Sequence, residues 1–261
     1  MDIQDNPAAT VSGDPLPQLP PPRRIRIIRD GILAFLGALA VGLFFTVAIL
    51  VVAMIGGGTR IAQDFKLSAP LIVSLLVAVE LPFAVFAIFL RWQYKRTHRG
   101  GPPLLEGRFL PAVLVGILGG LATAAFGLVH ALVSTYLFGK ASTESMEEVM
   151  KMLSVHENPT VAAALFLAVA VLAPLCEEFF FRGALFLPSR NMSNAKAAAI
   201  ASSVLFAIAH LNPAMFTYYL VFGLTMCWLL SKTKTIAAPI AAHMTVNTFV
   251  CIAVLVGSAT K

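Results

Sequence analysis

The chain has 261 residues, of which 58% are hydrophobic and only 12% are charged, and its formal net charge is +6. A soluble domain of this length carries charge on about 25% of its residues, so the composition excludes an ordinary soluble protein and indicates an integral membrane protein. The basic residues lie beside apolar runs, as they do in cytoplasmic loops, and do not form a surface suited to nucleic acid.

The chain begins with a polar, proline-rich stretch, residues 1–22, which we expect to be a disordered tail. Arg23, Arg24, Arg26 and Arg29 follow, and then a long apolar run. This run is longer than the hydrophobic segment of a cleavable signal peptide. We therefore expect an uncleaved membrane anchor.

Seven apolar runs predict an all-α fold, a polytopic transmembrane helix bundle with about seven spans. A crossing needs about 20 apolar residues, and the fifth run is short for one. We divide the rest of the chain into three N-terminal spans (residues 23–137), an outer loop (138–159) and a catalytic four-span core (160–257). The runs are residues 31–57, 69–90, 109–137, 160–187, 196–210, 214–230 and 235–257.

The distribution of Lys and Arg predicts the orientation of the bundle. Of the 19 such residues, thirteen fall on the same side as the N-terminus, five fall on the other side, and Arg182 lies within a span. The side with more positive charge faces the cytoplasm. We therefore expect a cytoplasmic N-terminus, in the plasma membrane if the source is bacterial.

The outer loop, residues 138–159, is acidic and has one apolar face. This face is formed by Met146, Val149, Met150 and Leu153. The pattern makes the loop a candidate interfacial amphipathic helix.

The fourth run contains three ionisable residues, Glu177, Glu178 and Arg182, although a charge near the bilayer centre costs roughly 2.5–3.5 kcal/mol on insertion scales. Glu178 and Arg182 are four residues apart and share a helix face, which predicts a buried pair. Glu177 faces elsewhere without a local partner, which suits a general base that accepts a proton from water. Pro174 removes a backbone donor and predicts a kink nearby.

Two later runs each contribute a histidine. Phe206 and His210 share one helix face, and so do His243 and Asn247. An imidazole can bind a metal, donate to an oxyanion or exchange protons with a carboxylate, whereas the Asn247 amide can act as a fixed donor toward developing negative charge. Each side chain alone would suit an interhelical hydrogen bond, but together with two carboxylates they favour a hydrolytic site.

The remaining polar and sulfur-containing residues fit structural roles better. Glu80 and His130, in the second and third runs, are weaker candidates for a direct role in a site. Cys176, Cys227 and Cys251 lie in apolar runs without a Cys-x-x-Cys motif, which is typical of small buried residues.

The three motifs resemble, in order, those of the CPBP family, which comprises CAAX proteases and bacteriocin-processing or self-immunity proteins and is also called the Abi family. The family pattern Glu-Glu-x-x-x-Arg stands at residues 177–182, Phe-x-x-x-His at 206–210 and His-x-x-x-Asn at 243–247. The resemblance covers about residues 160–250. It implies an intramembrane endopeptidase.

The resemblance also implies a role for each motif residue. Glu177 and His210 would activate water, His243 and Asn247 would stabilise the oxyanion, and Glu178 and Arg182 would support the site. The expected partners are a peptide or protein substrate at the membrane and the lipid bilayer, with no nucleic acid.

The resemblance leaves open whether the enzyme is a metalloprotease or a glutamate-dependent protease. Glu177, His210 and His243 are the candidate ligands of a metal such as zinc. We favour a metal-independent mechanism, because the chain has no His-Glu-x-x-His motif and Asn247 suits an oxyanion better than zinc. Two alternatives come from other classes: a non-catalytic immunity or partner-binding membrane protein, and a small ion- or proton-coupled transporter.

Overall fold

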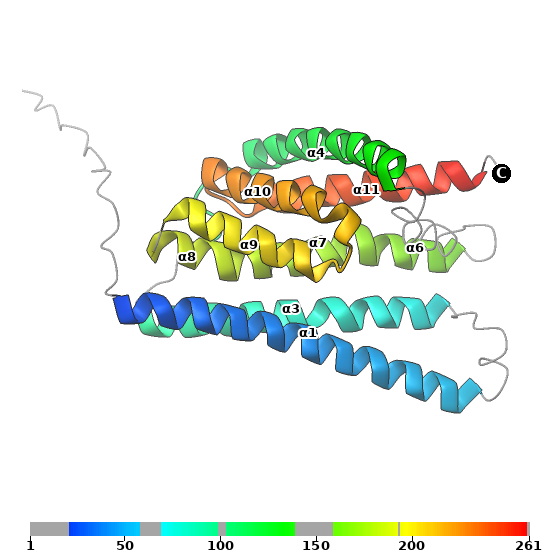
Figure 1. Ribbon diagram of the computed structural model, residues 1–261, viewed down its shortest axis with the longest axis horizontal. Helices are drawn as coiled ribbons and strands as arrows, with labels where there is room; N and C mark the ends of the chain where they lie inside the picture. The colour runs from blue at the N-terminus through cyan, green and yellow to red at the C-terminus, as the bar shows by residue number, and fades with distance from the viewer. Residues whose placement is uncertain (1–20, 58–68, 99–102, 139–158, 193, 260–261) are drawn as a thin grey trace, which may run out of the picture.

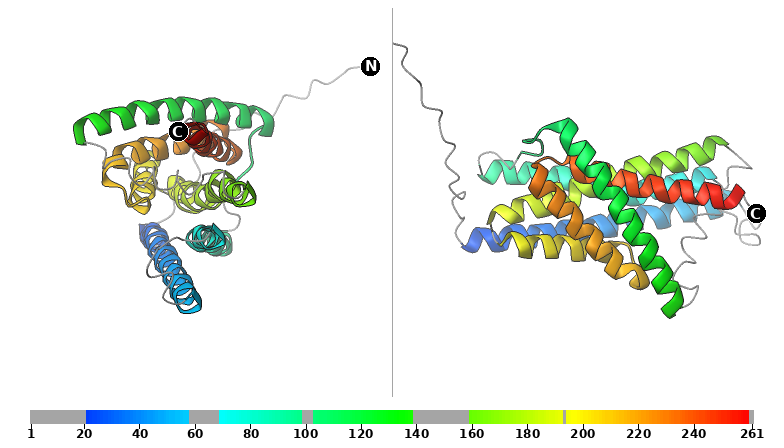
Figure 2. Two further views of the ribbon diagram at one scale, coloured as in Figure 1. Left: turned by 90° about the vertical axis from the view of Figure 1, so that its right-hand side faces the viewer. Right: turned by 90° about the horizontal axis from the view of Figure 1, so that it is seen from above.

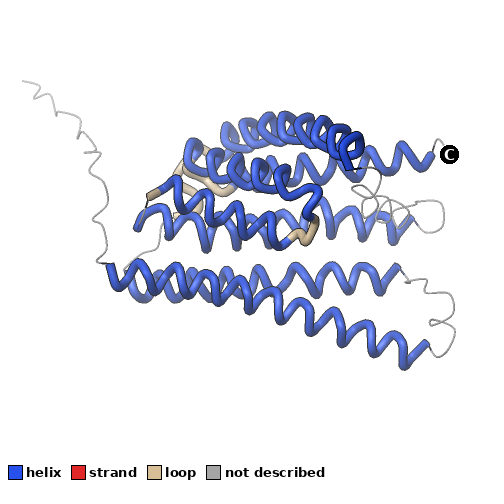
Figure 3. Tube along the Cα trace, in the orientation of Figure 1, coloured by secondary structure: helices blue, strands red, loops and turns tan. Residues whose placement is uncertain are grey.

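The computed structural model describes residues 21–57, 69–98, 103–138, 159–192 and 194–259. Within these ranges every element is helical (Figure 3), apart from one isolated antiparallel bridge between Leu105 and Thr235. The predicted all-α fold is therefore confirmed. Most of the expected tail and of the candidate interfacial helix, with Met146 to Leu153, lies outside the described residues.

The helices follow the predicted apolar runs. Five helical stretches have the length and apolar composition to cross a membrane, whereas α9 and residues 237–253 of α11 are shorter apolar helices. The bounds are α1 (Pro21–Gly57), α3 (Ala69–His98), α4 (Phe109–Phe138), α6 (Pro159–Leu167), η2 (Ala168–Leu172), α7 (Ala173–Glu178), η3 (Phe179–Phe186), α8 (Leu187–Met192), α9 (Ala195–Ala209), η4 (Pro213–Met215), α10 (Phe216–Thr233) and α11 (Ala237–Ala259).

The segment from α6 to α8 forms one interrupted helix in the middle of the bundle. Helices α1 and α3 pack on one side of it, and α4, α10 and α11 lie on the other side (Figures 1 and 2). A buried aromatic cluster joins the first pair to the centre, with ring centroids 5.1–6.5 Å apart. The cluster consists of Phe35, Phe83, Phe180 and Phe181.

Helices α4 and α11 approach each other closely because small residues line their contact. A Cβ atom added to Gly116 or Gly120 of α4 would clash with the backbone carbonyl of Ala238 or Ala242 of α11. Two glycines four residues apart, facing alanines, allow such backbone contact between membrane helices. This packing places α11, which carries His243, against the rest of the bundle.

Two stretches of the interrupted helix, η2 and η3, are π-helical. Pro174 follows η2 as the second residue of α7 and has no backbone N–H to donate to the preceding turn. In π-helical turns the backbone bonding pattern changes, which makes carbonyl groups available to other partners. Three such carbonyls accept side-chain donors from three surrounding helices, each at 2.8 Å: Val169 from Asn247, Phe181 from Ser202, and Gly183 from Arg91.

Candidate active site

The predicted pair of Glu178 and Arg182 forms the centre of the site. Arg182 Nη1 donates to Glu178 Oε1 at 2.9 Å, and both side chains are fully buried. Arg182 Nη2 also donates to the carbonyl of Gly223 at 3.3 Å, and the guanidinium carbon lies 4.6 Å from the centre of the Phe206 ring. A buried charge requires such compensation, since its desolvation is costly.

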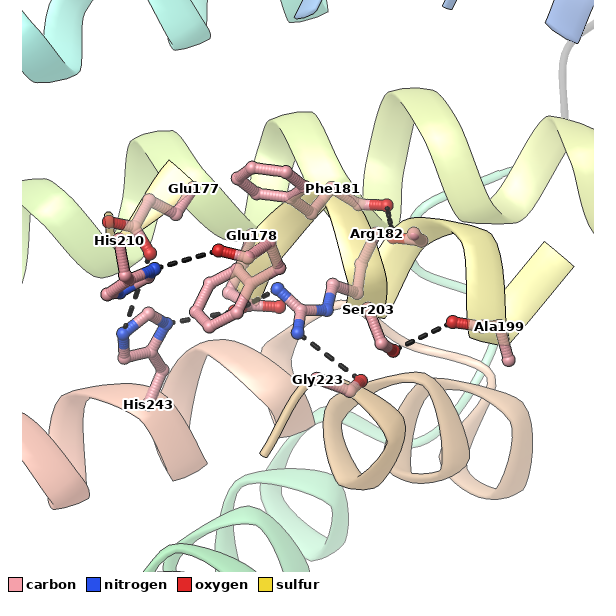
Figure 4. Close-up of polar contacts among 11 residues, drawn as sticks. Glu177, Glu178, Phe181, Arg182, Ala199, Ser203, His210, Gly223 and His243 are labelled. Carbon is pink, nitrogen blue, oxygen red and sulfur yellow. Dashed lines mark hydrogen bonds and ion pairs between the residues drawn. The ribbon is translucent and has the colours of Figure 1, made fainter. Parts of the chain in front are cut away.

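Glu178 also holds His243, a contact that the spacing of the motifs did not predict. His243 Nδ1 lies 2.9 Å from Glu178 Oε1, although the two residues are 65 positions apart in sequence (Figure 4). A carboxylate paired with an arginine acts as an acceptor, so Nδ1 carries the hydrogen. In the neutral imidazole this leaves a free lone pair on Nε2.

Glu177 faces the free side of the His243 ring. Its Oε2 lies 3.8 Å from His243 Nε2, too far for a direct hydrogen bond. This oxygen is buried and has no hydrogen-bond partner among the described residues. Two neighbouring acceptor atoms can both receive hydrogen bonds from one water molecule lying between them.

His210 lies at the end of α9 and belongs to the same group. The backbone turns sharply after it, where Leu211 has a φ of 49°. His210 Nδ1 lies 2.8 Å from the Phe206 carbonyl, which can only accept, so the neutral ring again has a free lone pair on Nε2. Figure 4 shows Glu177, His210 and His243 gathered at one end of the site, with Arg182 toward the other.

Tyr219 of α10 is a member of the site that the sequence did not indicate. Its ring centroid lies 3.9 Å from that of His210. No motif includes this tyrosine, and no helical spacing relates it to His210 or Glu177. A sequence-based signal for it was therefore absent.

Asn247 lies one turn beyond His243 on α11, as the spacing predicted. Its Nδ2 donates to the Val169 carbonyl at 2.8 Å, which fastens α11 to η2. The amide has a second N–H, and the bond to Val169 fixes the plane in which it lies. Its role toward an oxyanion stays a prediction.

The two weaker candidates differ in position. Glu80 of α3 has a buried carboxyl oxygen, Oε2, without a hydrogen-bond partner among the described residues, whereas His130 of α4 lies 3.3 Å from the Ser134 hydroxyl and beside the ring of Tyr218. Cys176, Cys227 and Cys251 are buried and free, as expected.

The three candidate metal ligands come from three different helices, with His210 at the end of α9. His210 Nε2, His243 Nε2 and the Glu177 carboxylate are donors of the kind that zinc accepts. Among the residues that the structure describes, however, no three His, Cys, Asp or Glu side chains are placed so that they could hold one metal ion. The metal independence of the mechanism stays a prediction.

Comparison with known proteins gives a match to one family model and to two relatives. Residues 159–249 match the family model described as "Type II CAAX prenyl endopeptidase Rce1-like". The chain is 27% identical over 177 residues to "Putative membrane peptidase YdiL" of Bacillus subtilis, an alignment that covers 64% of this chain and 66% of that protein. It is 32% identical over 82 residues to "UPF0177 protein YxdF" of Lactococcus lactis, covering 31% of this chain and 45% of that protein.

The chain thus spans less than two thirds of the length of each of these two relatives. No solved structure gives a significant match.

Proposed function

Because the part of the chain from residue 159 to residue 249 belongs to the CPBP family, we propose that this integral membrane protein is an intramembrane endopeptidase. Its substrates are membrane-associated peptides or proteins. The single observation that best supports the proposal is the 3.8 Å separation between Glu177 Oε2 and His243 Nε2. A water molecule held by both atoms would be positioned for attack on a peptide carbonyl.

In the proposed reaction Glu177 is the general base. It takes one proton from the water as the water oxygen bonds to the carbonyl carbon, and a tetrahedral intermediate forms. Glu177 then passes this proton to the leaving nitrogen, and the carbon–nitrogen bond breaks. The apolar helices around the site exclude bulk water, which strengthens these electrostatic interactions.

In this proposal His243 binds the attacking water, and Asn247 stabilises the oxyanion. The family resemblance implies instead that His210 acts with Glu177 and that His243 stabilises the oxyanion. However, a neutral His243 that donates from Nδ1 to Glu178 has no N–H at Nε2 and cannot donate to an oxyanion from there. The second N–H of Asn247 can donate toward negative charge. Glu178 and Arg182 hold the His243 ring in place, and His210 supplies a further acceptor on the same side.

The proposed function is tested by comparing the membranes of cells that produce the wild type or the Glu177→Gln variant. We expect new peptide N-termini that depend on the wild type and are missing with the variant, because the amide cannot accept the proton of water. Glu106→Gln, at an exposed glutamate outside the site, is the control and should cleave like the wild type. Equal cleavage by Glu177→Gln would contradict the proposal.

Metal dependence is tested on the purified protein. We expect activity to survive prolonged chelation and the zinc content to be far below one equivalent per chain. If stoichiometric zinc is lost together with activity in His210→Ala and His243→Ala, both histidines are ligands and the water is activated by a metal.

A further inference from the structure

Arg182 lies in a π-helical stretch, η3, whose backbone is held by side chains from two other helices. The hydroxyl of Ser202 on α9 donates to the carbonyl of Phe181, and the guanidinium of Arg91 on α3 donates to the carbonyl of Gly183, each at 2.8 Å. These carbonyls belong to the residues directly before and directly after Arg182. The backbone is therefore fixed on both sides of the arginine that the site uses.

The side chain of Arg182 connects this stretch of backbone to the site. Its Nη1 lies 2.9 Å from Glu178 Oε1, and the same oxygen lies 2.9 Å from His243 Nδ1. All three side chains are buried. A close-packed interior transmits displacements, so a shift in the backbone at Arg182 is passed through Glu178 to the imidazole.

Two adjacent serines of α9 make different bonds, although both are buried. The hydroxyl of Ser203 donates at 2.7 Å to the carbonyl of Ala199 in its own helix (Figure 4), which is a common bond for a serine within a helix. The carbonyl of Ala198 stands in the same relation to Ser202, yet the Ser202 hydroxyl donates across to η3. Ser203 is therefore a matched control for the contact that Ser202 makes.

We propose that Ser202 is a positioning residue for the site. By fixing the carbonyl that precedes Arg182, it holds the guanidinium against Glu178, and Glu178 in turn orients the His243 ring. Arg91 supports the same backbone from another helix. The effect of Ser202 on turnover rests on the proposed function, whereas its effect on the backbone of η3 does not.

The backbone effect is tested by hydrogen–deuterium exchange of the purified full-length protein without any substrate. We expect the amides of η3 to exchange roughly two to ten times faster in Ser202→Ala than in the wild type, as the loss of one hydrogen bond predicts. Ser203→Ala also loses a buried hydroxyl and should match the wild type over η3. Equal exchange of η3 in the two variants would overturn the proposal, whether or not the protein cleaves any peptide.

The positioning role is tested by the turnover of the same two variants. We expect the kcat of Ser202→Ala to fall by about tenfold with little change in KM, since a small displacement of a reacting group slows the chemical step. Ser203→Ala should stay within about threefold of the wild type. Similar midpoints of thermal unfolding would show that the two variants are equally stable. An equal loss of kcat in both would assign the effect to packing and overturn the role.

The bond from α3 gives a second test. Arg91→Met removes the donor to the Gly183 carbonyl and keeps an apolar stem, so its kcat should also fall with little change in KM. Arg96→Met, at an exposed arginine of the same helix, is the control and should turn over like the wild type. Unchanged kcat in both Arg91→Met and Ser202→Ala would overturn the proposal. If the wild type cleaves no peptide, the proposed function fails, and the exchange of η3 alone decides the role of Ser202.

Discussion

Glu177 and Glu178 are neighbours in the chain but have different partners. Glu178 Oε1 lies 2.9 Å from both Arg182 Nη1 and His243 Nδ1, whereas Glu177 Oε2 has no hydrogen-bond partner in the described structure. Successive residues of a helix point about 100° apart, so the two carboxylates face different groups. Substitution of Glu177 and substitution of Glu178 should therefore affect different properties of the protein.

Glu178→Gln is expected to destabilise the protein, because it leaves the buried Arg182 without its anionic partner. Loss of one member of a fully buried ion pair costs roughly 3–5 kcal/mol. Glu177→Gln should change stability much less while abolishing cleavage. Thermal unfolding of both variants in detergent measures the difference, and equal midpoints would refute this division of roles.

Tyr219 is expected to position His210 through its ring. Tyr219→Leu removes the ring that lies against His210 and should lower kcat/KM by about tenfold, since an aromatic pair contributes about 0.5–1.5 kcal/mol beyond its buried area. Tyr219→Phe keeps the ring and should stay within about threefold of the wild type. Tyr218→Phe, on the adjacent residue, is the control. A loss in Tyr219→Phe equal to that in Tyr219→Leu would assign the effect to the hydroxyl instead.

Sequence spacing predicted the local part of the site and missed the long-range part. The contact between Glu178 and Arg182 follows from four-residue helical periodicity, and the structure confirms it. The bond between His243 and Glu178 depends on how α11 packs against α7, which no periodicity encodes. The same is true of Tyr219 beside His210 and of the Val169 carbonyl that binds Asn247.

At the scale of helices, apolar length predicted the elements but not their internal geometry. The run 196–210 corresponds closely to α9, Ala195–Ala209, which begins where the Asn194 side chain accepts a hydrogen bond from the Lys196 N–H. The run 160–187 reads as one helix, whereas the structure contains π-helical stretches on both sides of Glu177 and Glu178. Such turns depend on side chains from other helices that satisfy the available carbonyls.

The contact between α4 and α11 should not tolerate even a methyl group. Gly116→Ala and Gly120→Ala place a Cβ atom against backbone carbonyls of α11, and we expect each to cost about 1–3 kcal/mol of stability. Gly119→Ala is the matched control, because the atoms nearest to its Cβ would belong to the side chain of Leu229, at 3.2 Å, and not to the backbone. Similar unfolding temperatures for all three variants would show that this contact is not tight.

At the scale of the whole molecule, composition was sufficient to predict a membrane-embedded helical bundle. The order of the layers was not predictable, because nearly every helix is apolar over most of its surface and pattern alone does not select its neighbours. The central position of the interrupted helix is explained by its contacts: the aromatic cluster on one side, and the donors from α9, α11 and α3 around it.

The orientation in the membrane is proposed from the excess of Lys and Arg on one side. Reporter fusions after Arg99 and after Lys151 should lie on opposite sides, with the former in the cytoplasm together with the N-terminus. The two positions lie outside the described residues, so their placement is a prediction from sequence. Reporters on the same side would contradict the proposed topology.

The residues of the site lie far apart in the sequence, so the ribosome adds them at different times. Sixty-five residues separate Glu178 from His243, and ribosomes add about 5–20 residues per second. The carboxylates therefore leave the ribosome about 3–13 s before His243, the residue that we propose to orient the water. Under the proposed function, a nascent chain lacks hydrolytic capacity during this interval and cannot attack neighbouring polypeptides until α11 has packed into place.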